Sequence, residues 1–66
     1  MTLPSAEFYF AQNGVDYTVF PAGWSENGCD VFDVIVTESD EFVDSILVSP
    51  VEDIETAWNR WLSARH

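Results

Sequence analysis

The sequence DVFDVIVTESDEFVDSILVS, residues 30–49, decides the fold. Two runs rich in β-branched and aromatic residues, 31–37 and 42–48, flank the polar loop 38–41. Runs of this composition on either side of a short polar segment are typical of a β-hairpin. The stretch therefore predicts two antiparallel strands near the middle of the chain.

The expected register of this hairpin follows from placing Thr37 opposite Phe42. One face would then carry an apolar set ready for a packing partner: Phe32, Val34, Val36, Val43 and Leu47. The opposite face would carry acids among apolar residues: Asp33, Ile35, Thr37, Phe42, Asp44 and Ile46. A slip of one residue would exchange the two faces.

The C-terminal stretch SPVEDIETAWNRWLSARH predicts an amphipathic helix over residues 50–64. Ser49 fits the N-cap position, Pro50 the first helical position, and Glu52 completes a capping box. Acids lie at the positive end of this helix, while Arg60 and Arg65 lie at its negative end. Apolar residues recur on one helical face: Val51, Ile54, Trp58, Trp61 and Leu62.

The N-terminal half is less definite. Residues 14–21 predict a strand, and residues 21–28, PAGWSENG, predict a loop. Residues 4–13 fit either a strand that turns at Asn13-Gly14 or a short helix that ends at Gly14. We expect Trp24, within the loop, to cover the core, with an interface anchor as the alternative.

These elements predict one α+β domain over residues 1–66. A small antiparallel sheet of three or four strands would carry the C-terminal helix on one face, with a short N-terminal helix possible. The chain has no disulfide, since Cys29 is the only cysteine, so packing must stabilise it. Its hydrophobic content of 47%, with three Trp and five Phe, fits a folded domain rather than an acidic tail.

The charge of the chain is strongly one-sided. Twelve acids face two arginines, for a formal net charge of −10. Both arginines fall after residue 59, so the rest of the chain has no base of its own. Repulsion between like charges disfavours nucleic acid and anionic membrane as ligands. A basic protein surface is the natural complement.

The candidate partner-binding residues belong to the region around TESDEFVD, residues 37–44. Such carboxylates form charge-assisted hydrogen bonds with Lys and Arg. On a strand, residues two apart share a face and are separated by about 6.7 Å, which is similar to the distance between neighbouring phosphates of a nucleic-acid strand. The alternative is a solvated turn. The candidates are Asp30, Asp33, Glu38, Asp40, Glu41 and Asp44.

Other functional classes find little support in the residues. His66 is the only histidine, so no nucleophilic triad is predicted and we do not expect an enzyme. The acids lack the calcium-loop pattern, and Cys29 and His66 have no zinc spacing, so we expect neither a metal site nor a cofactor.

The stretch CDVFDVIVTESDEFVDSILV and its unpaired acids resemble small acidic phage anti-CRISPR proteins of the DNA-mimic kind, most of all inhibitors of the type I-C system. The resemblance rests on size and charge, without a signature motif. It implies a non-enzymatic inhibitor. We also expect a monomer in the cytoplasm of a bacterial host cell, since the lone thiol of Cys29 suggests a reducing compartment. The implied partner is a type I CRISPR surveillance complex, whose DNA binding would be blocked.

Two alternatives stay open. The chain would also suit an antitoxin or immunity protein that plugs the basic active site of a nuclease. A phage structural or assembly factor would instead use the apolar residues Ile35, Phe42 and Ile46.

Overall fold

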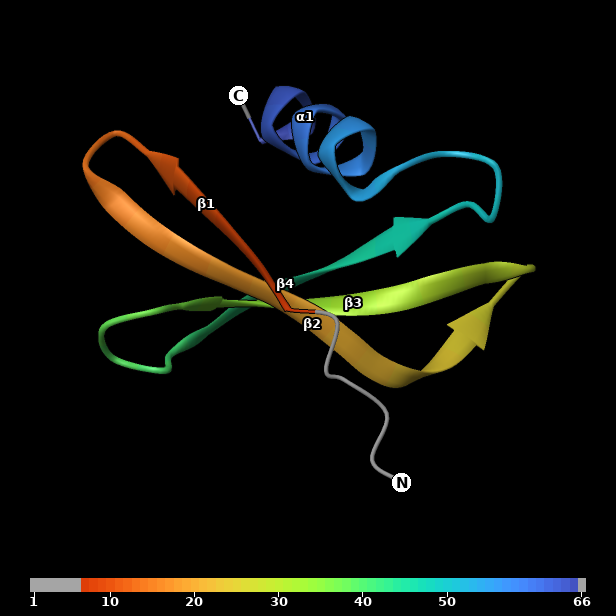
Figure 1. The fold of residues 1–66 in the computed structure, drawn as a ribbon, viewed down its shortest axis with the longest axis horizontal. Helices are drawn as coiled ribbons and strands as arrows, with labels where there is room; N and C mark the ends of the chain where they lie inside the picture. The colour runs from red at the N-terminus through yellow and green to blue at the C-terminus, as the bar shows by residue number, and fades with distance from the viewer. Residues whose placement is uncertain (1–6, 66) are drawn as a thin grey trace.

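The computed structural model describes residues 7–65, which form a four-stranded antiparallel sheet and one helix. The strands are neighbours in chain order, and the helix lies over one face of the twisted sheet (Figure 1). This confirms the predicted α+β fold. Within residues 7–65, no helix is long and apolar enough to cross a membrane. The elements are β1 (Phe8–Gln12), β2 (Val15–Glu26), β3 (Cys29–Val36), β4 (Phe42–Val48) and α1 (Ile54–Ala64).

Two Asn-Gly turns join the first three strands. Asn13 and Gly14 have φ values of 53° and 79°, and Asn27 and Gly28 have φ values of 51° and 78°. Positive φ at both central residues is the hairpin geometry that Asn-Gly favours. Of the two alternatives predicted for residues 4–13, the strand that turns at Asn13-Gly14 is confirmed over residues 8–12. Residues 4–6 lie outside the described part of the chain.

The predicted loop over residues 21–28 is wrong over residues 21–26, because β2 continues to Glu26; only Asn27 and Gly28 form a turn. Its register with β3 shifts between Pro21 and Ser25, so an irregular bulge takes up the Pro and Gly residues. Trp24 lies in this bulge and is 57% exposed, so it does not cover the core as expected.

The register of β3 with β4 differs by one residue from the prediction. Phe32 lies opposite Ile46, and Val34 lies opposite Asp44. A bulge between Val34 and Ile35 shifts the pairing by one further residue, so Ile35, rather than Thr37, lies opposite Phe42. Ile46 is therefore buried in the core, while Leu47 is exposed. The polar turn residues 38–41 do not determine this register by themselves. At the bulge, one step along β3 matches two steps along β4, which changes the pairing of every residue beyond it.

The core lies between α1 and the sheet. Trp58 stacks on Phe10 of β1, with ring centroids 4.6 Å apart and an interplanar angle of 9°. Tyr17 of β2 packs against both Trp58 and Trp61 at 5.5 and 6.4 Å. Ala57 is fully buried and lets the helix approach. The buried residues of this cluster are Val19, Val34, Ile46, Val48, Ala57, Trp58 and Trp61.

The helix begins later than predicted. Its N-cap is Asp53, whose Oδ1 accepts from the backbone N–H of Thr56 at 2.9 Å. Ser49 and Glu52 do form a capping-box hydrogen bond, but it closes a turn that precedes the helix. Val51, predicted on the apolar face, is 92% exposed in that turn.

The turn at Gly28 gives a stability prediction. A Cβ at this φ is strained, so G28A should lower the free energy of unfolding by about 1–2 kcal/mol. Urea unfolding followed by tryptophan fluorescence measures the change. S25A, at an exposed position of the same hairpin, should stay within about 0.5 kcal/mol of wild type. Equal stability of G28A and S25A would contradict the assigned turn.

Candidate functional site

The turn between β3 and β4 holds its shape through its backbone. The N–H of Asp40 donates to the carbonyl of Val36, and the N–H of Val36 donates to the carbonyl of Glu41, both at 2.8 Å. Ser39 adds a longer contact to the N–H of Glu41 at 3.4 Å. Glu38, Asp40 and Glu41 are all exposed. Their carboxylates are therefore not needed to build the turn and can face a partner.

A fourth carboxylate joins this turn from β2. The N–H of Thr37 donates to the carbonyl of Asp16 at 2.9 Å, and the hydroxyls of Thr18 and Thr37 lie 2.7 Å apart. These contacts bring exposed Asp16 beside the turn. The β1–β2 and β3–β4 turns lie at the same end of the sheet (Figure 1). We call Asp16, Glu38, Asp40 and Glu41 the acidic end.

Sequence reasoning missed Asp16, although a signal for it was present. The Asn13-Gly14 turn fixes the start of β2 at Val15, which places Asp16 at the turn end of the sheet. In a meander, the first and third turns fall at the same end because alternate strands run the same way. Combining the two hairpins would therefore have brought Asp16 next to residues 37–41.

The other three candidate acids do not share one surface, and two of them, Asp30 and Asp33, lie away from the turn. Asp30 is exposed at the far end of β3, opposite Ser25 and Val48. It is six residues from Val36, or roughly 20 Å along the strand. Asp33 lies mid-strand opposite Ser45, whose hydroxyl donates to it at 3.3 Å. The structure brings Glu38, Asp40 and Glu41 together and leaves Asp30 and Asp33 apart.

The prediction that Asp44 shares a face with Asp33 is wrong. It lies opposite Val34 on the helix side, where the indole Nε1 of Trp61 donates to its Oδ2 at 3.0 Å. This hydrogen bond, helped by the backbone N–H of Ser45, lowers the pKa of Asp44 below its usual 3.8. The carboxylate therefore anchors the helix to β4.

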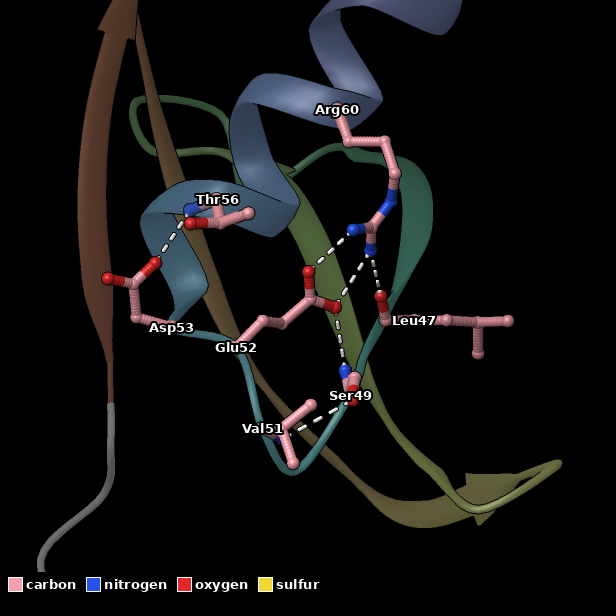
Figure 2. A network of polar contacts seen from close by, with 7 residues as sticks. All are labelled: Leu47, Ser49, Val51, Glu52, Asp53, Thr56 and Arg60. Carbon is pink, nitrogen blue, oxygen red and sulfur yellow. Dashed lines mark hydrogen bonds and ion pairs between the residues drawn. The ribbon is translucent and has the colours of Figure 1, made fainter.

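The arginines are engaged on the helix side of the molecule. Arg60 forms the one ion pair among residues 7–65, with Glu52 at 2.5 and 3.0 Å, and also donates to the carbonyl of Leu47 at 2.8 Å (Figure 2). The guanidinium of Arg65 lies 4.6 Å from the ring centroid of Trp61. The acidic end receives no ion pair from either arginine.

The described carboxyl groups whose pKa is shifted are all more acidic than usual. Where the carboxyl pKa values are shifted, in Asp44, Glu52 and Asp53, they are lowered, so these groups stay ionised and are weak bases. No group of three or more His, Cys, Asp or Glu residues within 7–65 could hold a metal ion. The acidic end can offer negative charge and hydrogen-bond acceptors to a cationic group.

No family model matches the chain, and neither the curated proteins nor the solved structures include a significant match. Functional assignment therefore depends on the geometry and charge of the described residues.

The hydrogen bond to Asp44 can be tested by D44A. Loss of the acceptor leaves the Trp61 N–H without a protein partner, so the free energy of unfolding should fall by about 1–2 kcal/mol. D30A removes an exposed acid of the neighbouring strand and should leave stability almost unchanged. Urea titrations of the two variants and wild type give the comparison. If D44A and D30A unfolded alike, the bond would carry no stabilising role.

The ion pair at Glu52 predicts a pH dependence. Hydrogen bonds from Arg60 and from the N–H of Ser49 lower the pKa of Glu52 from 4.5 to about 2. A carboxyl with a lowered folded-state pKa stabilises the fold above its unfolded pKa, and this contribution disappears as pH falls through the folded pKa. E52Q should therefore have a lower Tm than wild type near neutral pH.

The Tm difference between wild type and E52Q should narrow as pH falls from 4.5 toward about 2. Differential scanning calorimetry across this range measures it. E26Q, which removes an exposed acid without an ion pair, is the control for the general loss of charge. A Tm difference that stayed constant with pH would contradict the pairing of Glu52 with Arg60.

Proposed function

We propose that this chain is a non-enzymatic inhibitor that uses negative charge to block DNA binding by a type I CRISPR RNA-guided surveillance complex. The observation that supports this proposal most directly is the acidic end. Its exposed carboxylates come from β2 and the β3–β4 turn, and no strand of the sheet contains lysine or arginine. The charge is available to another molecule because neither arginine, and no other cation within residues 7–65, pairs with it there.

A DNA-binding groove supplies the complementary chemistry. Such a groove is lined with Lys and Arg that contact phosphates and draw much of their affinity from that charge. Carboxylates make hydrogen bonds with the same side chains, and with arginine these can be bidentate. Occupation of the groove by the acidic end would exclude DNA without any covalent step. The net charge of −10 would also speed encounter with the groove at low salt.

Charge also supports action as a monomer. Two copies that each carry a net charge of −10 repel one another, and this repulsion rises as salt is lowered. A stoichiometric complex with a basic partner removes that repulsion instead of increasing it. The lowered pKa values of Asp44, Glu52 and Asp53 add support for a binding protein, since none of these groups is poised for acid catalysis near neutral pH.

The test replaces the turn acids by amides in the variant E38Q/D40N/E41Q. The backbone bonds that hold the turn remain, and Asn tolerates the φ of 59° at residue 40. Three exposed ion pairs of about 0.5–1 kcal/mol each correspond to a loss of roughly 30-fold in affinity. DNA binding by the purified surveillance complex, titrated with each protein in a mobility-shift assay, measures the inhibition.

The matched control removes three exposed acids elsewhere, in the variant E26Q/D30N/E55Q. Both variants change the net charge from −10 to −7 (−10 + 3), so a difference between them reports position rather than total charge. The control should inhibit like wild type. Equal inhibition by both variants would remove the acidic end from the mechanism, and failure of wild type to inhibit would refute the proposed partner. Capture of a small basic nuclease instead would point to an antitoxin.

A further inference from the structure

A hollow in the surface adjoins the acidic end and has a different chemical character. It encloses about 340 Å³, is open to solvent, and lies at the edge of the sheet formed by β1 and β2. The residues that line it are Tyr9, Phe10, Ala11, Asp16 and Thr37. An aromatic ring, a carboxylate and a hydroxyl thus meet in one concave site.

The strand register explains why these groups meet. Ala11 lies opposite Asp16, and Tyr9 lies opposite Thr18, so the four residues form two adjacent rows across β1 and β2. Thr37 extends the first row through its backbone hydrogen bond to Asp16. Small Ala11 leaves space between the larger side chains. The hollow is therefore a product of the hairpin pairing and does not depend on the bulges in the other strands.

Tyr9 is the most exposed aromatic side chain described, at 68%. Its hydroxyl donates to Oε1 of Glu7 at 3.2 Å, so the polar end of the side chain is held by a residue just before β1. The ring is thus left without a packing partner of comparable size: it takes no part in the ring contacts that join Phe10 and Tyr17 to the helix. Exposed aromatic area beside a carboxylate suits a ligand that is both flat and cationic.

We infer that the hollow between Tyr9 and Asp16 receives an arginine side chain of the basic partner. This inference rests on the proposed function and names the group that the acidic end recognises. A guanidinium stacks on an aromatic face and forms a bidentate pair with a carboxylate, whereas the ammonium of lysine is a compact charge that does neither as well. Tyr9 and Asp16 supply the two halves of that recognition.

The chain cannot fill the hollow from its own described cations. Arg60 is paired with Glu52 on the helix side, and Arg65 lies over Trp61. A second copy of the chain would bring another net charge of −10 toward Asp16 and the neighbouring turn. Charge complementarity therefore favours a separate, basic protein as the source of the arginine.

Two peptides of equal length and charge test this inference: hexa-arginine and hexa-lysine, titrated against the full chain by isothermal calorimetry. Wild type should bind hexa-arginine several-fold more tightly than hexa-lysine. Y9L should lose about threefold in affinity for hexa-arginine, the loss expected for an exposed cation–π contact. D16N should lose a similar amount, and both should abolish the preference for arginine.

Matched variants separate recognition from general effects. Y9F keeps the ring and should bind like wild type, while E55Q carries the same charge change as D16N on an exposed helical position. F42L removes another strongly exposed aromatic side chain of the sheet, at 60%, and should have no effect. Equal binding of both peptides, or equal affinity of Y9L and F42L, would overturn the inference. So would a dimer of wild type in sedimentation that Y9L abolishes.

The DNA-binding assay distinguishes this inference from the proposed function. If D16N and Y9L inhibit the surveillance complex as wild type does while E38Q/D40N/E41Q does not, the arginine site is refuted and the inhibitor proposal stands. If wild type does not inhibit, the inhibitor proposal is refuted, and the peptide titrations still decide whether the hollow selects arginine.

Discussion

The stacking of Trp58 on Phe10 is the contact on which the rest of the structure depends. A domain of this size buries a limited share of its surface, so a few large side chains must supply most of the packing. Trp58 connects α1 to β1 directly and to β2 through Tyr17. Trp61 adds the hydrogen bond to Asp44 on β4, the strand at the other edge. One turn of helix thereby fixes the helix against both edges of the sheet.

The position of the helix also determines where the positive charge of the two arginines lies. Arg60 and Arg65 both lie on α1 or at its end, and packing holds their contacts to Glu52 and Trp61 on that side. The strands carry acids without a base, and the acidic end lies beside the β1–β2 and β3–β4 turns. Exposed carboxylates of this kind repel one another, which costs stability.

Much of the architecture could be predicted from local patterns, and the errors have identifiable causes. The strands around residues 38–41, the apolar helix and its two core tryptophans follow from side-chain periodicity and are confirmed. The loop assigned to residues 21–28 is wrong because Pro and Gly were read as breakers, although Asn27-Gly28 repeats the hairpin signal of Asn13-Gly14. The register of β4 is wrong because a bulge leaves no distinct mark in composition.

That bulge has a direct consequence for the candidate site. Asp33 and Asp44 were expected on one face, but the pairing of Val34 with Asp44 places them on opposite faces of the sheet. Asp44 then contacts the helix, whereas Glu38, Asp40 and Glu41 lie together at the β3–β4 turn, where Asp16 joins them from a neighbouring hairpin. The sequence shows how many acids the chain has but not on which surface each one lies. Strand pairing and bulges determine the face of the sheet on which each carboxylate lies. The acidic end is therefore built by two hairpins whose turns lie at one end of the sheet.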